Sequence, residues 1–239
     1  MKIFDTHVHF DYYTEEERKN ILQECLDQEI DFLHLAIKEE AFEFLSTYKK
    51  QYALGIHPIY AETASSRYKD ALELFLPKAL ALGEIGLDGY RSPVTKKQIF
   101  LFQEQLEIAL TYKKPVLIHT RNASKATIDI LKKFSGKFVI HSFTGDPDIL
   151  ELGLDKNAYF GINGMITFAK NIELQASLKH IPKERILVET DAPFLSPIRG
   201  QTNYPQNSTL IMNKIHTLLE TDMSEVILEN TKNFLGDLY

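Results

Sequence analysis

The 239-residue sequence predicts an α/β fold, a closed (β/α)8 barrel of parallel strands, and three observations support this prediction. Short apolar segments alternate with longer segments of helical periodicity, as in chains of repeated βαβ units. Eight such pairs can be counted, which is the number that closes a barrel. An open doubly wound sheet, the alternative fold, would be favoured by a glycine-rich phosphate loop after the first apolar segment, and the sequence has none there.

The predicted elements follow one another at short intervals. The segments expected to be strands are 3–9, 32–37, 52–57, 81–86, 116–119, 138–141, 158–162 and 186–190. The segments expected to be helices are 14–29, 39–50, 67–80, 96–113, 123–134, 147–156, 171–180, 206–220 and 224–235. The first helix opens with a capping box, in which Thr14 bonds forward and Glu17 reaches back. In the fourth, Phe100, Phe102, Leu106 and Leu110 are expected to form a buried stripe.

The composition indicates an ordinary globular protein with 44% hydrophobic and 25% charged residues. No repeat or linker divides the chain, so residues 1–239 are interpreted as a single domain. The single cysteine, Cys25, excludes an internal disulfide framework and a cysteine-based zinc site. A signal-peptide pattern and an apolar run of the ~20 residues that cross a membrane are both missing, so we expect a cytoplasmic protein without a membrane partner, monomeric by default.

The net charge of −6 argues against a broadly basic surface that coats nucleic acid. It does not exclude a nuclease, because a metal centre and a few local cations can bind phosphate in an acidic protein.

Residues with metal-binding or acid–base side chains close most of the predicted strands. In a parallel barrel, catalytic groups come from the carboxyl ends of the strands. The residues at these ends are His7, His9, His57, Glu84, His119, His141 and Asp191. The other histidines, His34, His180 and His216, lie elsewhere and are interpreted as structural or surface residues.

Each of these positions alone has a structural explanation, such as a hydrogen-bonded core histidine or an aspartate that caps a turn. Together they predict a metal centre, because so many ligand-type residues share one kind of location. Four of these histidines together with Glu84 and Asp191 would be too many ligands for one tetrahedral ion. Such a set suits two divalent cations. The donors fit Zn, Mn, Co or Fe, whereas Mg better suits an all-carboxylate site. We expect Glu84 to bridge the ions, and Asp191 to act both as a ligand and as the acceptor of a proton from the attacking water.

Six sequence motifs resemble those of the TatD-like metal-dependent hydrolases, a family within the amidohydrolase-type barrels. They are His-x-His at 7–9, Gly-x-His-Pro at 55–58, Gly-Glu-x-Gly-Leu-Asp at 83–88, Ile-His-Thr-Arg at 118–121, His-Ser-Phe-Thr-Gly at 141–145 and Glu-Thr-Asp-Ala-Pro-Phe-Leu at 189–195. The resemblance implies a TIM barrel and a divalent-metal deoxyribonuclease of exonuclease type, acting on single-stranded DNA or on a DNA end.

The same resemblance implies a division of the ligands between two metals. His7, His9, Glu84 and Asp191 would hold one ion, and Glu84, His119 and His141 would hold the second. His57 would lie near the substrate phosphate. Many related barrels bridge their metals with a carboxylated lysine, so glutamate at position 84 weakens a deaminase or dihydroorotase interpretation.

Candidate substrate-binding residues follow several strands. Arg121, Arg91 and Arg199 could contact phosphate. Aromatic residues that could stack on bases are Phe143, Tyr60, Tyr90 and Tyr204. The last loop departs from the family pattern, because Tyr204 replaces a carboxylate expected to face the barrel mouth.

That departure leaves the substrate open between single-stranded DNA, RNA, another phosphoester and an amide. The alternatives are therefore a small-molecule amide or ester hydrolase of the same fold and a non-catalytic scaffold subunit. Membership of a larger assembly is compatible with any of them.

Overall fold

The computed structural model describes residues 2–47 and 51–236, and in it eight parallel strands lie side by side in sequence order. The strands are β1 (Ile3–Val8), β2 (Ile30–Ala36), β3 (Tyr52–Leu54), β4 (Ala81–Asp88), β5 (Val116–Arg121), β6 (Phe138–Ile140), β7 (Tyr159–Ile162) and β8 (Ile186–Val188). The sheet closes where Val8 pairs with Ala192, just beyond β8. The backbone N–H of His9 donates to the carbonyl of Ala192 at 2.8 Å. The predicted barrel is confirmed.

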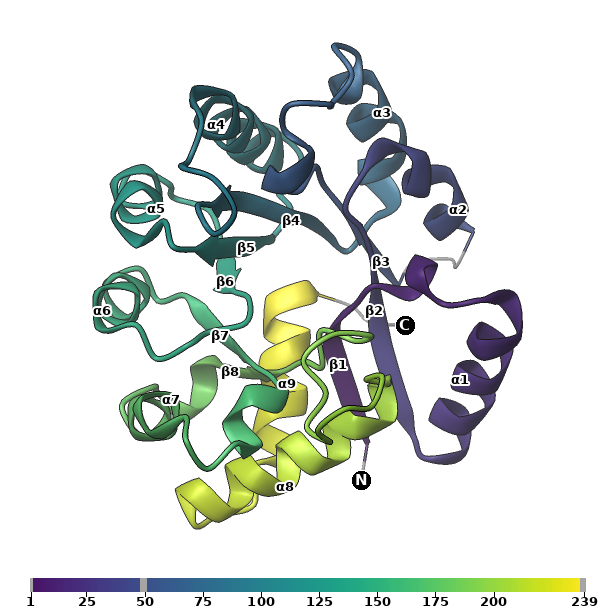
Figure 1. The fold of residues 1–239 in the computed structure, drawn as a ribbon, viewed down its shortest axis with the longest axis vertical. Helices are drawn as coiled ribbons and strands as arrows, with labels where there is room; N and C mark the ends of the chain where they lie inside the picture. Colours follow the sequence, from purple (N-terminus) through teal and green to yellow (C-terminus); the bar gives the residue numbers. More distant parts are fainter. Residues whose placement is uncertain (1, 48–50, 237–239) are drawn as a thin grey trace.

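Helices surround the strands, and the last of them lies toward the middle of the ring, as Figure 1 shows. They are α1 (Glu15–Asp27), α2 (Phe42–Ser46), α3 (Tyr68–Phe75), α4 (Lys96–Thr111), α5 (Ser124–Leu131), α6 (Pro147–Asp155), α7 (Ile172–Leu178), α8 (Ser208–Leu219) and α9 (Ser224–Leu235). Each corresponds to a predicted helix, and the Thr14–Glu17 capping box is present. No helix of the described ranges is long and apolar enough to span a membrane.

Several predicted elements are shorter than expected, and two of them bear on the site or on the described residues. The segment 52–57 is a strand only over Tyr52–Leu54, because the chain then turns into the loop that carries His57. The segment 39–50 contains a 3-10 turn at Glu39–Ala41 and the short α2, and residues 48–50 lie outside the described residues.

The predicted buried stripe on α4 is wrong for two of its four residues. Phe102 and Leu106 are buried, whereas Phe100 is 58% and Leu110 is 45% exposed. Residues 100 and 102 are two apart, so their side chains point to different faces of a helix. The buried face instead consists of Gln98, Leu101, Phe102, Gln105, Leu106 and Ala109.

A small apolar cluster fills the barrel interior at the end opposite the strand ends that carry the candidate ligands. Its members come from the strands and from α9, and they include Phe4, Leu33, Leu117, Val139, Leu187, Phe234 and Leu235. The helix α9 packs against β1 and β8, and Asn230 donates to the carbonyls of Lys183 and Ile186 at the start of β8. This end of the barrel is therefore closed by α9, so chemistry is confined to the carboxyl end.

An irregularity in β4 places Glu84. The register with β5 shifts between Leu82 and Ile85, and Gly83 and Gly86 on either side have φ of 153° and 147°. A Cβ on Gly86 would lie 1.9 Å from the carbonyl oxygen of His119, so this contact requires glycine. The two glycines accompany this break in the regular pairing of β4 with β5, and Glu84 lies within it.

Candidate metal centre

Five imidazoles surround the carboxylate of Glu84, which is 2% exposed. Its Oε2 lies 3.3 Å from Nε2 of His7 and 3.8 Å from Nε2 of His9. Its Oε1 lies 2.6 Å from Nδ1 of His119, and 3.4 and 3.6 Å from Nε2 of His57 and of His141. The two oxygens thus face two different groups of histidines.

Asp191 completes the first group. Its Oδ1 lies 3.1 Å from Nε2 of His9, 3.7 Å from Nε2 of His7 and 3.8 Å from Nε2 of His141. The residue has φ of +59°, in the left-handed region that most residues with a side chain avoid and that aspartate adopts more readily. The backbone is held by the N–H of Asp191, which donates to the carbonyl of His7 at 3.0 Å.

Three groups of side chains among the described residues lie close enough together to hold an ion. One is His7, His9 and Asp191, as expected for the first metal. Another combines Glu84 and His119 with His57, and a third combines His7 and His141 with Glu189. His141 therefore lies between the two centres, and its ring stacks on that of His7 with centroids 3.5 Å apart.

The buried charges of the site suit cations. Burial raises the pKa of the Glu84 carboxyl, but the imidazoles of His57, His141 and His119 together outweigh this effect and hold the pKa well below its usual range. Burial likewise raises the pKa of Asp191, and His141 and His9 lower it to a net value below the ordinary one. Ionised carboxylates in an apolar interior are costly unless cations compensate them.

An imidazole nitrogen without a hydrogen bond also points into the site. The ring of His7 is fully buried, and its Nε2 makes no hydrogen bond within residues 2–47 and 51–236. A buried nitrogen of this kind, facing two carboxylates, is the donor that a divalent ion would use. The residues present therefore fit metal ions.

His57 differs from the other histidines in its tautomer. Its Nδ1 accepts the backbone N–H of Ile59 at 3.2 Å, so in the neutral ring the proton resides on Nε2. Burial lowers the pKa of His57 to about 4, which keeps the ring neutral at pH 7. The Nε2–H of His57 therefore faces the site as a hydrogen-bond donor, in contrast to a metal-binding lone pair.

Two acidic residues of the site were quoted only as parts of motifs in the sequence. Glu189 is fully buried, and its Oε1 lies 2.9 Å from Nδ1 of His141 and accepts the backbone N–H of Ser142 at 2.6 Å. Oδ2 of Asp88 lies 3.0 Å from Nε2 of His119. A carboxylate behind a ligand histidine fixes the ring's orientation and tautomer. Their places at the ends of β4 and β8 were the available signal.

Asp5, which is fully buried in β1, lies beneath the site. It accepts the backbone N–H of His7 at 3.1 Å and bonds from the N–H and hydroxyl of Thr190 at 2.9 and 2.5 Å. Asp5 therefore ties β1 to the segment after β8.

The remaining sequence predictions meet different outcomes. Arg121 and Arg199 are exposed, and the Arg121 guanidinium lies 3.6 Å from the centre of the Tyr90 ring. Phe143 is buried against Phe160 and is unable to stack on a base. Tyr204 stacks on Tyr13 instead of facing the mouth.

The histidines interpreted as structural include His34, which is buried among Phe10 and Phe32. His216 lies 3.5 Å from Asp222 at the end of α8, on the outer layer.

Known proteins resemble this chain over nearly its whole length. The family model described as "TatD related DNase" matches residues 4–236. An uncharacterised metal-dependent hydrolase of Buchnera aphidicola subsp. Baizongia pistaciae is 34% identical, over 98% of this chain and 95% of its own. The "3'-5' ssDNA/RNA exonuclease TatD" of Edwardsiella piscicida is 39% identical over 60% of this chain and 58% of its own.

The fold comparison agrees. The crystal structure of YjjV, a TatD homologue from Escherichia coli, superimposes with a TM-score of 0.86 and 25% identity over 98% of both chains. With the family model spanning the barrel and the candidate ligands gathered at its mouth, the chain belongs to the TatD-related family of metal-dependent hydrolases.

Proposed function

We propose that this protein is a phosphodiesterase with two divalent metals, most specifically an exonuclease of single-stranded DNA. The observation that carries the proposal is that the two carboxylate oxygens of Glu84 face different histidines. Its Oε2 faces His7 and His9 and its Oε1 faces His119, with the nearest nitrogens 3.3 and 2.6 Å away. A carboxylate whose two oxygens face separate ligand groups is arranged to bridge two ions.

The ligands divide as follows in this proposal. His7, His9 and Asp191 would hold one ion together with Glu84. His119 and His141 would hold the other, also with Glu84. Bound divalent ions would supply a nucleophile from water at neutral pH and neutralise charge on the phosphate.

The protein's own groups supply the other functions. Asp191, ionised and within 4 Å of three ligand histidines, accepts the proton of the attacking water. The neutral His57 donates its Nε2–H to a non-bridging phosphate oxygen, whose negative charge grows in the transition state. Asp88 and Glu189 hold His119 and His141 in the ligand tautomer.

Polynucleotide is favoured over a small molecule by two features. Arg121 is exposed at the end of β5 and Arg199 is exposed in the loop after β8, where they can meet phosphates of an extended chain. The Edwardsiella piscicida relative is described as an exonuclease of single-stranded DNA and RNA. The cytoplasmic location and monomeric state expected from the sequence stay predictions.

The test compares substrate classes with one enzyme preparation reconstituted with Mn or Zn. End-labelled single-stranded DNA, the matching RNA and a nitrophenyl ester are incubated separately. Progressive shortening of the DNA supports the proposal, and preferential shortening of the RNA would reassign the substrate. Turnover of the ester alone would replace the proposal with the small-molecule hydrolase.

A further inference from the structure

Two exposed aromatic rings flank the proposed first metal site. Tyr12 follows β1, Phe194 follows β8, and each is 44% exposed. Their ring centroids are 5.4 Å apart, at an interplanar angle of 76°. The centroid of His9 lies 5.7 Å from that of Tyr12 and 5.5 Å from that of Phe194. We propose that Tyr12 and Phe194, here called the aromatic pair, bind the base of the nucleotide whose phosphate is cleaved, one ring stacking on its face and the other contacting its edge.

This inference rests on the proposed function and assigns the part of the site that binds the base. The reacting phosphate would lie among Glu84, Asp191 and His57. One sugar separates a nucleotide's base from its phosphate, and the aromatic pair lies directly beside the metal-site residue His9. Base–aromatic stacking tolerates any sequence, as a general exonuclease requires.

Core packing does not account for the exposure of these rings. Other aromatic residues near the strand ends are covered: Phe143 is 1% exposed, and Phe10 is fully buried. On the opposite side of the mouth, Tyr90 already stacks with Arg121. The aromatic pair therefore offers ring surface to a substrate at the place where a base would follow the phosphate.

The pair is held in position before any substrate arrives. The N–H of Phe194 donates to the carbonyl of Asp191 at 2.8 Å. The buried amide of Asn203 donates to the carbonyls of Phe194 and Thr190 at 2.6 and 2.9 Å. The hydroxyl of Tyr12 lies 3.4 Å from that of Tyr60. A platform fixed in this way loses little conformational entropy on binding.

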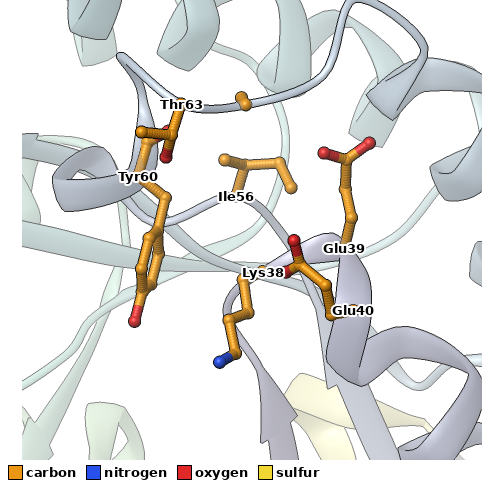
Figure 2. Close-up of a pocket in the computed structure, with 7 residues that line it drawn as sticks. Lys38, Glu39, Glu40, Ile56, Tyr60 and Thr63 are labelled. Atoms are coloured by element: carbon orange, nitrogen blue, oxygen red, sulfur yellow. The ribbon is translucent and has the colours of Figure 1, made fainter.

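A pocket lies next to the aromatic pair, on the side of Tyr60. Its volume is about 270 Å³, and it is lined by Tyr60 together with Lys38, Glu39 and Glu40. Figure 2 shows the Tyr60 hydroxyl and the Lys38 ammonium extending away from the Glu39 carboxylate. Because two carboxylates line this pocket, it does not suit a phosphate. The phosphate is therefore assigned to the metal centre and the base to Tyr12 and Phe194.

The test uses single-stranded DNA with an ordinary or an abasic nucleotide at each end in turn. Tyr12→Ala and Phe194→Ala are expected to lower kcat/KM on ordinary DNA about five- to hundredfold, as loss of one stacked base predicts. On DNA that is abasic at the attacked end, kcat/KM of the wild type should fall by a similar factor. For the variants, kcat/KM should fall little further than it does on ordinary DNA. Tyr12→Phe should keep stacking and retain activity. Phe100→Ala, which removes an exposed ring from α4, is the matched control.

The inference is overturned if the variants match the wild type, or if they lose the same factor on ordinary and abasic DNA. If the wild type cleaves no DNA, the proposed function fails, and binding of adenosine monophosphate then decides the inference. Tighter binding by the wild type than by Tyr12→Ala supports a base platform. Equal binding, or none, contradicts it.

Discussion

Nδ1 of His141 lies 2.9 Å from Oε1 of the fully buried Glu189. This relationship directs the opposite nitrogen of the ring toward Glu84 and Asp191. Burial lowers the pKa of His141, but the negative charges of Glu189, Glu84 and Asp191 together outweigh this effect and raise the pKa to about 10. The carboxylates around His141 would also stabilise a cation bound next to its ring.

Replacing Glu189 should therefore weaken metal binding without touching a proposed ligand. We expect Glu189→Gln to lose roughly 10- to 100-fold in metal affinity, as is typical when a partner behind a ligand histidine is removed. Titration calorimetry with Zn or Mn measures this. Glu184→Gln, an exposed glutamate just before β8, is the control, and an unchanged affinity in Glu189→Gln would exclude the role.

Gly161 allows Glu189 to occupy its place. A Cβ at position 161 would lie 2.1 Å from Oε2 of Glu189. Gly161→Ala should therefore destabilise the fold, by about 1–3 kcal/mol as for other overpacked cores. Urea denaturation of this variant, of Glu189→Ala and of the double variant forms a mutant cycle. The double variant should recover part of the loss, whereas strictly additive changes would show that the clash is absent.

The buried His34 should make stability depend on pH. Burial lowers its pKa to about 3 in the folded protein, against about 6.5 in the unfolded chain. Between pH 6.5 and 3 the unfolded state binds a proton that the folded state does not, so stability falls as pH falls through this window. We expect His34→Gln to reduce this slope by on the order of 1 kcal/mol per pH unit. Urea denaturation of both proteins at pH 7 and pH 5 gives the difference, and parallel slopes would contradict it.

The capping box of α1 should contribute measurably to stability. The hydroxyl of Thr14 accepts the N–H of Glu17 at 3.3 Å, and Glu17 accepts the N–H of Thr14 at 2.8 Å. We expect Thr14→Ala to lower the free energy of unfolding by about 1 kcal/mol. Thr217→Ala, near the end of α8, removes a hydroxyl that donates to the Asn213 carbonyl within the same helix, and it should be nearly neutral. Equal effects of the two variants would argue against the capping role.

Strand order and the gathering of ligand-type residues were predictable from the sequence, because alternation of apolar and helical segments fixes which side chains end each parallel strand. His7, Glu84 and Asp191 meet for this reason although they lie far apart in the chain. The break in the pairing of β4 was not predictable, because glycines in turns and in irregular strands look alike in sequence. The contact of His141 with Glu189 was not predictable from the sequence either, since it depends on how side chains at the ends of different strands meet.

Periodicity misled where neighbouring aromatic residues compete for one face. Phe100 was predicted to be buried with Phe102, yet a separation of two residues turns their side chains apart. Similarly, Phe143 follows a ligand histidine and suggested a base contact, but it packs in the core. The exposed Tyr12 and Phe194 follow other candidate ligands in the same way, and only their burial distinguishes the two cases.

The most direct test is cleavage of end-labelled single-stranded DNA by metal-stripped protein, with Mg, Mn or Zn added back separately and Glu84→Ala measured alongside. Cleavage that requires added metal and disappears in a folded Glu84→Ala protein is the result that we predict. Circular dichroism checks that the variant is folded. Full cleavage by Glu84→Ala would contradict the bridging role, and no cleavage by the wild type with any of the metals would contradict the nuclease.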